Sequence, residues 1–323
     1  MLRKILLSFV ALFIIAAALG GYLYGPMLTG ITTGKIRYLV KPSPERYAKD
    51  ALAIVETLAI NADSPEFTQA KDVALEAATT AKSFEDTYEP LRAALKAGGG
   101  KHSNFLAPSD NELSTVDSAE MPVVEKRGEL AYLKLPALSR GEAGPSYATI
   151  LTDGIHEHAR CGAIIDLRGN GGGDMGPMLG GLSPLLPDGT ALEFVSRTAT
   201  TQVTVEGNAV KGGGTPTTTN GGKRDVPTAV LTDADTASSG EATMLAFRGL
   251  PNSRSFGAPT AGYASGNVVI DLYDGAGLMI TTAKDRARTG EEFSDDPIQP
   301  DVTTEDPEAD AAAWLRQQCT TWR

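Results

Sequence analysis

Cysteine is scarce in this chain of 323 residues, with only Cys161 and Cys319 present. Two cysteines exclude a disulfide-dense scaffold, and neither lies in a CxxC pair that would indicate a zinc or redox site. They can form one disulfide or none. Positive charge is also in deficit, because 29 Lys and Arg face 40 Asp and Glu. The resulting net charge of -11 argues against nucleic-acid binding, which depends on clustered basic residues.

Internal repeats and metal-ligand clusters are missing as well. No period of about 20 to 50 residues recurs, which excludes solenoids and propellers. Of the three histidines, His156 and His158 have i, i+2 spacing, so they face different directions and form a poor metal site. We therefore expect neither a metal nor an organic cofactor.

A long uncharged run is present, from Ile5 to Gly25, and it follows Arg3 and Lys4. The run is long enough to cross a bilayer, and its positive flank belongs on the cytoplasmic side. We predict a transmembrane signal-anchor over residues 1–25 and an extracytoplasmic location for the rest. A cleaved signal peptide is the alternative, because small residues occur at 16–20, although the run exceeds the usual secretory core.

The remainder divides at a glycine run. Apolar residues recur near the helical period over residues 43–96, and Gly98-Gly99-Gly100 ends that pattern because three residues without Cβ disfavour further helix. Beyond it, short apolar runs separated by Gly and Pro alternate with helical patterns, which is typical of an α/β fold. We predict a helical N-terminal subdomain over 26–100 and an α/β domain over 101–323.

Within the α/β domain, the runs Cys161–Leu167 and Thr228–Thr232 have the length and composition of buried strands. Residues 206–223 are rich in Gly and Thr and are predicted to form an exposed flexible loop. The other predicted strands are Leu130–Leu135, Val268–Leu272 and Leu278–Thr282, and the predicted helices are Tyr147–His158, Met175–Leu182, Ser238–Phe247 and Pro307–Gln318.

A glycine-rich turn follows the first buried strand, where Asp166 to Gly173 reads Asp-Leu-Arg-Gly-Asn-Gly-Gly-Gly. Exposed backbone N–H groups at the start of a helix stabilise anions. The turn lacks the Lys-Ser/Thr ending of a P-loop and the spacing of a dinucleotide fingerprint, so an oxyanion is the better candidate. The alternative is a tight turn that only packs the strand against its helix.

Ser238 lies between the second buried strand and a predicted helix, in Thr236-Ala237-Ser238-Ser239-Gly240-Glu241. A serine at such a turn can project its Oγ into a cleft, beside N–H groups that face a developing negative charge. Ser238 and Glu241 also fit a capping box, which is the purely structural alternative. If Ser238 needs a base, His102 is the first choice, although a lone histidine is often structural.

Taken in their order along the chain, these segments resemble the tail-specific or C-terminal-processing serine peptidases and the related tricorn protease core. The resemblance covers roughly residues 100 to 303. Asp166–Gly172 is similar to the family's Asp-Leu-Arg-Asn-Asn-Pro-Gly-Gly, and Thr236–Glu241 to its nucleophile turn. Gly257–Gly262 is similar to Gly-Glu-Pro-Thr-Phe-Gly, and Ile298–Val302 matches Ile-x-Pro-Asp-Val.

The resemblance implies that Ser238 is the nucleophile and that the backbone N–H groups of Gly172 and Ser239 form the oxyanion hole. It also implies a crotonase- or ClpP-like spiral of ββα units. The lysine that many relatives use is replaced here by Tyr263, which excludes a Ser–Lys dyad at that position. The tricorn-like branch uses a histidine instead, and His102 stands where that branch has its Ser-His.

Two further expectations follow from the resemblance. An acid that orients the histidine is expected just before Ile298, where Glu291, Glu292, Asp295 and Asp296 are the candidates, and we favour Glu292. A PDZ module is absent, because the chain between Phe105 and Val123 is far shorter than a domain.

We therefore predict a membrane-anchored extracytoplasmic serine peptidase that cleaves polypeptides through an acyl-enzyme, with Ser238 as nucleophile and His102 as general base. A catalytically inactive module that binds a peptide or lipid is the alternative, since the retinoid-binding repeats of the eye resemble this peptidase fold. A membrane-tethered interaction protein, in which residues 43–96 recruit partners, is a third hypothesis.

Overall fold

The computed structural model describes residues 2–113 and 120–321, without the side chains of residues 2–11, 13–16, 111–113, 320 and 321. The chain forms two compact units, which are described separately. The helical unit comprises Met1–Val116 and Asn267–Thr282, and the sheet unit comprises Asp117–Gly266 and Ala283–Arg323. Helices and sheets together confirm the α/β class, whereas the spiral of ββα units stays a prediction.

The helical unit differs from the predicted subdomain in its membership. It extends past the glycine run and includes a distant segment, because β1 pairs with the first part of β12 in an antiparallel ladder. The boundary predicted at residue 100 therefore does not coincide with the division in the structure. The elements of this unit are α1 (Leu2–Thr33), α2 (Pro44–Leu58), α3 (Pro65–Ala78), η1 (Glu85–Thr87), α4 (Tyr88–Gly99), β1 (Asn104–Leu106), α5 (Pro108–Leu113), most of β11 (Ser265–Asp271) and the first half of β12 (Gly277–Ala287).

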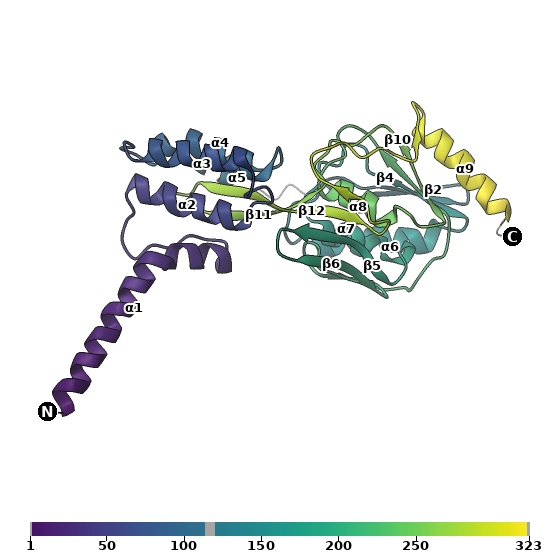
Figure 1. Cartoon of the computed structure of the whole chain (residues 1–323). Helices are drawn as coiled ribbons and strands as arrows, with labels where there is room; N and C mark the ends of the chain where they lie inside the picture. Colours follow the sequence, from purple (N-terminus) through teal and green to yellow (C-terminus); the bar gives the residue numbers. More distant parts are fainter. Residues whose placement is uncertain (1, 114–119, 322–323) are drawn as a thin grey trace. The chain divides into compact units, whose positions relative to one another are not determined.

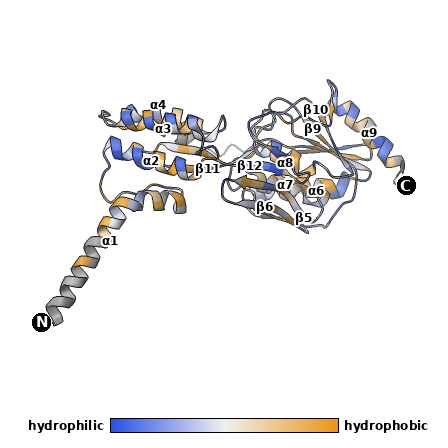
Figure 2. Ribbon diagram, in the orientation of Figure 1, coloured by the Kyte–Doolittle hydropathy of each residue, from blue (hydrophilic) through white to orange (hydrophobic). Residues whose placement is uncertain are grey.

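Local sequence accounts for the helix boundaries in this unit. Ser43 and Ser64 are N-caps whose hydroxyls accept from the backbone N–H groups three residues on, and a proline occupies the first turn in each case. Gly100, with φ of 75°, ends α4, as the glycine run predicted. Figure 2 shows hydrophilic and hydrophobic residues on different sides of α2, whose apolar side packs into the core of the unit.

The first helix, α1, contains the predicted anchor. Most side chains of the uncharged run, those of residues 5–11 and 13–16, lie outside the described part of the chain. Among the residues that were described, no helix offers an apolar stretch long enough to cross a bilayer. The anchor over residues 1–25 therefore stays a prediction.

The sheet unit is built on a six-stranded sheet in the order β14-β10-β9-β4-β3-β2. The five strands from β14 to β3 are parallel, and β2 is antiparallel to β3. Both β4 and β9 are buried along their whole length, as their apolar runs predicted. The strands are β2 (Val123–Arg127), β3 (Leu130–Lys134), β4 (Gly162–Asp166), β9 (Thr228–Thr232), β10 (Ser253–Gly257) and β14 (Val302–Thr303).

Helices cover both faces of this sheet. One face packs against α6, α7 and α8 around the largest apolar core, and the other packs against α9, where Ala311 and Leu315 contact Leu231 and its neighbours. Figure 1 shows α9 beside β4 and β10. The helices are α6 (Gly144–His158), α7 (Met175–Leu182), α8 (Ser239–Phe247) and α9 (Pro307–Thr321), with a 3-10 turn η2 (Ser183–Leu185) after α7.

An antiparallel sheet completes the unit and corrects one expectation. Residues 206–223 are not simply an exposed loop, because they contain β7 and β8, and both Thr217 and Thr219 are buried. Gly213 packs so closely on Met175 that a Cβ would lie 2.0 Å from its methyl carbon. The strands of this sheet are β5 (Gly189–Ser196), β6 (Thr200–Glu206), β7 (Ala209–Lys211), β8 (Thr217–Thr218), the second half of β12 and β13 (Glu292–Phe293).

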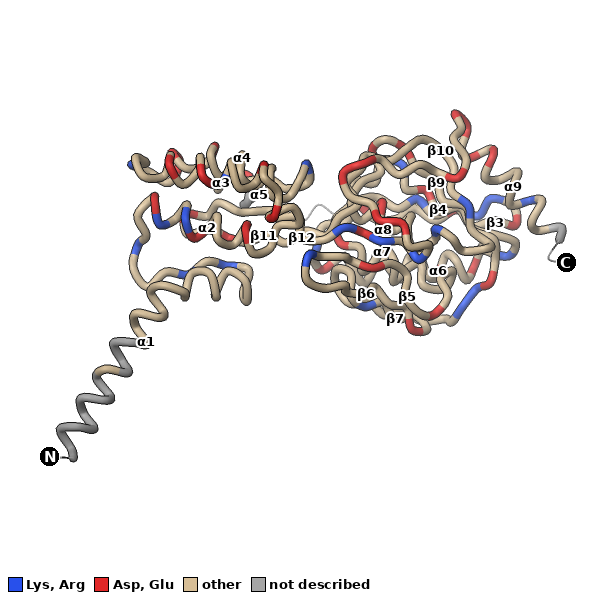
Figure 3. Tube along the Cα trace, viewed as in Figure 1, with Lys and Arg blue, Asp and Glu red and all other residues tan. Residues whose placement is uncertain are grey.

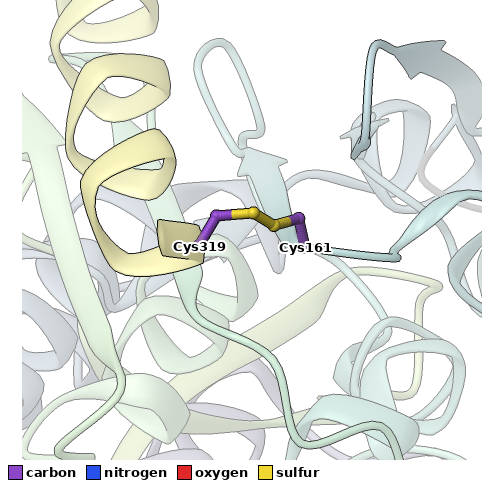
Figure 4. Close-up of a disulfide and its surroundings, with 2 residues drawn as sticks. All are labelled: Cys161 and Cys319. Atoms are coloured by element: carbon purple, nitrogen blue, oxygen red, sulfur yellow. A yellow bond between two sulfur atoms is a disulfide. The ribbon is translucent and has the colours of Figure 1, made fainter. Parts of the chain in front are cut away.

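A disulfide joins Cys161, just before β4, to Cys319 on α9, with a Cα–Cα distance of 5.3 Å (Figure 4). It closes a sequence separation of 158 residues, so it restricts the unfolded chain strongly. Replacing both cysteines by serine is expected to lower the free energy of unfolding by about 2–5 kcal/mol. Urea unfolding measures this, and the variant should no longer respond to reductant. An equal response of both proteins to reductant would contradict the prediction.

Candidate active site

Ser238 occupies a sharp turn between β9 and α8. Its backbone has φ of 52° and ψ of -118°, and it is the only non-glycine residue of the described part of the chain with positive φ. This conformation is costly for a residue with a Cβ and persists only where the surroundings enforce it. A strained serine between a buried strand and a helix is the geometry of a nucleophile elbow.

The glycine-rich turn after β4 lies directly against this elbow. A Cβ on Gly172, which has φ of 105°, would come within 2.7 Å of the Ser238 Cβ and 3.0 Å of the Ser239 nitrogen. Only glycine permits this approach. The predicted oxyanion-hole residues Gly172 and Ser239 are thus brought together beside Ser238, although the Gly172 N–H already donates to Asn170 Oδ1 at 2.9 Å.

Asn170 ties the two turns together from inside the core, where it is fully buried. Its carbonyl accepts from the Ala237 N–H at 2.9 Å, and its side-chain amide donates to the Leu135 carbonyl at 3.0 Å. Together with the bond to Gly172, these contacts hold the glycine turn, the elbow and the end of β3 in one arrangement. Sequence analysis did not single out Asn170, because an asparagine in a glycine-rich turn has many ordinary roles.

Asp166 and Arg168, from the same motif, fix the start of the turn. Arg168 donates to both carboxylate oxygens of Asp166, at 2.9 and 2.7 Å, and Tyr132 donates to Asp166 Oδ2 at 2.5 Å. Burial favours the neutral acid, but the bonds from Arg168 and Tyr132 outweigh it and lower the pKa of Asp166. The paired carboxylate is therefore a structural support for the turn.

Glu241 holds the elbow in place through its side-chain carboxylate. It is fully buried and accepts from the backbone N–H of Ser238 at 2.9 Å, which is one half of the predicted capping box. It also accepts from the N–H groups of Gly262 and Tyr263, at 2.8 and 2.7 Å, and from the Thr260 hydroxyl. One carboxylate thus joins Ser238 to the Pro-Thr-Ala-Gly segment, and the capping hypothesis and the nucleophile hypothesis are both compatible with this structure.

The closing Ile-x-Pro-Asp motif holds this segment in place. The Ile298 N–H donates to Thr260 Oγ1 at 2.9 Å, and the Thr260 N–H donates to the Ile298 carbonyl at 3.1 Å. Asp301 accepts from both the backbone and the hydroxyl of Ser255 on β10. All four motifs identified in the sequence therefore belong to the sheet unit and support one elbow.

Asp285 is a second buried carboxyl group near Glu241, and its Oδ1 makes no hydrogen bond with the described residues. Burial raises the pKa of Asp285 well above its ordinary value of 3.8, and the negative charge of Glu241 raises it further. Burial and the nearby Glu241 charge thus both favour the neutral form of Asp285. Sequence analysis missed it, because its burial depends on strand pairing with β5 and β13.

Asp285 should make stability fall as pH rises. Above pH 3.8 the unfolded chain releases this proton while the folded unit retains it, so folding becomes less favourable by up to about 1.4 kcal/mol per pH unit until the folded pKa is reached. Asp285→Asn removes the effect, so its gain in stability over the wild type should grow as pH rises above 3.8. Urea unfolding measures this, with the exposed Asp153→Asn as control. A gain independent of pH would contradict it.

His102 lies in the helical unit, after α4. Its ring approaches the side-chain amide of Asn267 on β11, with Asn267 Nδ2 2.9 Å from Nδ1 and 3.0 Å from Nε2. The Asn267 Oδ1 is buried and makes no hydrogen bond with any described residue. The next residue, Ser103, is buried and donates to Thr281 Oγ1 on β12 at 3.1 Å. The segment that carries the predicted base is thus anchored to two strands.

Glu292, the favoured orienting acid, lies on β13 in the sheet unit and is exposed. Its Oε1 is 3.7 Å from an Arg286 nitrogen, while Glu291 pairs with Arg248 at 2.9 Å. One contact of the His102 ring comes from an amide, that of Asn267, and the sequence had given no signal for it. Within the described residues, no group of three His, Cys, Asp or Glu could hold a metal ion.

Comparison with known proteins gives one family. Residues 129–304 match the family model described as Peptidase family S41. The chain is similar to a nisin-resistance protein of Lactococcus lactis subsp. lactis, with 37% identity over 87% of this chain and 90% of that protein. It is also similar to the solved structure of a lipoprotein from Streptococcus agalactiae, with 30% identity, 87% and 99% coverage and a TM-score of 0.75. A photosystem II D1 C-terminal processing protease shares the fold, at 16% identity, 83% and 94% coverage and a TM-score of 0.58.

Proposed function

Because the chain belongs to peptidase family S41, we propose that it is a serine peptidase with Ser238 as its nucleophile. The strained elbow at Ser238 carries this proposal, since a serine that served only as a helix cap would not need positive φ. The Oγ of Ser238 attacks the peptide carbonyl, and the acyl-enzyme is then hydrolysed by water.

In this mechanism His102 is the general base. It takes the proton of Ser238 during the attack and gives it to the leaving amine. The proposal requires that the imidazole reach the hydroxyl during catalysis. Tyr263, which replaces the lysine of many relatives, donates its backbone N–H to Glu241, so its main chain supports the elbow.

The tetrahedral intermediate needs hydrogen-bond donors beside Ser238. We propose the N–H of Ser239, in the first turn of α8, and the N–H of Gly172. Because Gly172 donates to Asn170 Oδ1 at 2.9 Å, it must exchange this bond for one to the oxyanion. The exchange is favourable because an anionic acceptor forms the stronger bond.

Asn267 is proposed to orient His102 in place of the expected acid. A half-turn of its amide would place Oδ1 where Nδ2 now lies, so that it accepts from Nδ1–H and leaves Nε2 as the base. In the present orientation the buried Oδ1 makes no bond with any described residue, so the half-turn sacrifices no hydrogen bond of that oxygen. The role predicted for Glu292 would then pass to Asn267.

The substrate is proposed to be a polypeptide, and nisin is the first to test, because a relative with 37% identity is named for resistance to it. The full chain is incubated with nisin and with an unstructured protein, and fragments are identified by mass spectrometry. A fluorophosphonate probe should label Ser238 and leave Ser238→Ala unlabelled. If neither fragments nor labelling are observed, the peptidase proposal is wrong and a ligand-binding module is favoured.

The protein is further proposed to be held at the outer face of the cytoplasmic membrane. The uncharged run from Ile5 to Gly25 behind Arg3 and Lys4 supports this. The similar Streptococcus agalactiae protein is described as a lipoprotein, which agrees with a location in the cell envelope. Extraction of the full chain with the membrane fraction, and its release only by detergent, is the expected result.

A further inference from the structure

The helical unit carries a segment whose composition differs from the rest of this acidic chain. The first 44 residues contain no Asp or Glu, and Glu45 is the first acidic residue. Between the uncharged run and α2, this stretch contains Lys35, Arg37 and Lys41, all exposed. Figure 3 shows basic but no acidic residues between α1 and the start of α2. In a chain with net charge -11, this is a local reversal of sign.

The same segment exposes large apolar side chains. Pro26 and Gly30 are buried against the rest of the helical unit. A Cβ on Gly30 would lie 2.6 Å from the Ile54 side chain on α2. The opposite side of α1 carries Leu28 and Ile31, which are exposed although aliphatic. Figure 2 shows hydrophobic residues along these last turns of α1. A helix facing only water would carry polar residues there.

Beyond α1, the chain exposes Leu39 and Val40, which are 71% and 60% accessible. Leu39 lies beside α1, since a Cβ on Gly21 would be 3.7 Å from its methyl carbon. The exposed side of α1 and residues 35–41 thus form one surface, which we call the basal surface. It combines aliphatic side chains with cations, which is the composition of segments that lie in a membrane interface.

The basal surface is joined firmly to the end of the predicted anchor. Pro26 has no N–H, so it cannot donate to the Tyr22 carbonyl four residues before it. Arg46 of α2 donates to that carbonyl instead, and its guanidinium carbon lies 3.9 Å from the centroid of the Tyr22 ring. The bend that a proline introduces in α1 is therefore held by α2, which fixes where the basal surface begins.

We infer that the basal surface lies on the outer leaflet of an anionic membrane, with its aliphatic side chains among the acyl chains and its three cations at the lipid phosphates. This inference rests on the proposed anchor, which delivers the surface to the bilayer. The cations also offset the repulsion between an acidic protein and an anionic membrane. The remainder of the helical unit would then face away from the lipid.

Site-directed labelling in proteoliposomes tests this inference. The two native cysteines form a disulfide, so Leu39→Cys, Val73→Cys and Leu19→Cys each offer one thiol for a fluorophore. Val73 is the matched control, because it is exposed and aliphatic but lies on α3, with α2 between α3 and α1 in Figure 1. Leu19 reports the anchor. The full chain is placed in vesicles of phosphatidylglycerol and phosphatidylcholine, with a nitroxide-bearing lipid or aqueous iodide as quencher.

Quenching by the lipid nitroxide is expected at Leu39 and Leu19 but not at Val73. The combined variant Lys35→Gln, Arg37→Gln, Lys41→Gln should lose the quenching at Leu39 and keep it at Leu19. If Leu39 is quenched only by iodide while Leu19 is in lipid, the inference is wrong and the anchor stands. If Leu19 is also quenched only by iodide, the anchor and the inference both fail, while peptidase activity is unaffected.

Discussion

Replacing Ser238 by alanine is expected to lower kcat/KM for a cleaved polypeptide by about 10⁴-fold or more, the loss found when a serine nucleophile is removed. The substitution deletes the attacking oxygen but should leave the elbow intact, because alanine keeps the backbone N–H that donates to the Glu241 carboxylate. Substrate binding should therefore change little. Alanine and serine both carry a Cβ and tolerate positive φ equally poorly, so stability should stay close to that of the wild type.

The measurement is single-turnover cleavage by the full chain, with fragments quantified by mass spectrometry. Ser146→Ala is the matched control, because Ser146 is an exposed serine on α6 of the same unit. It should retain wild-type activity. If Ser238→Ala cleaves within about tenfold of the wild-type rate, at most about 1.4 kcal/mol of transition-state stabilisation is lost. The nucleophile then lies elsewhere.

The features of the candidate site that could be predicted from the sequence are those specified by local sequence. A buried strand, a glycine that admits a close neighbour and a serine three residues before a glutamate are all specified within one short segment. The turn at Gly172 and the elbow at Ser238 are such features, and the structure places them in contact. The family resemblance adds the order of the motifs. Two of these motifs meet in the structure, where the Ile298 N–H donates a hydrogen bond to Thr260 Oγ1.

The parts that the sequence does not predict depend on pairing between distant segments. The helical unit is completed by residues 267–282, which no local pattern assigns to it. Asn267 meets His102 because β11 and β12 return to that unit. The pKa of Asp285 is raised because neighbouring strands bury it, and because it lies near Glu241. Strand pairing across long sequence separations leaves little trace in composition, so these three features required the structure.

The buried carboxyl groups also show how strain at the elbow is sustained. Glu241 replaces the missing hydrogen-bond partners of three backbone N–H groups, each worth roughly 1.5–3 kcal/mol when the acceptor is charged. That is enough to hold Ser238 in a conformation that costs about 1–3 kcal/mol. A second ionised carboxylate nearby would weaken this arrangement, and burial opposes it by raising the pKa of Asp285.

His102→Ala is expected to lower kcat by on the order of 10²–10⁴-fold, which is the usual contribution of a positioned base. A histidine accepts a proton only when it is neutral, so the wild-type rate should fall at acid pH. The His102→Ala variant should lose that dependence. Single-turnover cleavage across a pH series measures both effects. An unchanged acid limb in the variant would contradict the role of His102.

Asn267→Ala then tests whether Asn267 orients the His102 ring for catalysis or only packs against it. The ring of His102 would lose its amide partner, so kcat should fall by about 10- to 100-fold, a part of the contribution of the base, with little change in KM. Asn267→Asp should restore most of the rate, because a carboxylate also accepts from Nδ1–H. Asn104→Ala on β1, which pairs with β12 in the same helical unit, is the control. If Asn267→Ala lowers stability while kcat is retained, Asn267 only packs against the ring, and the orienting group is to be sought among the carboxylates that the sequence proposed.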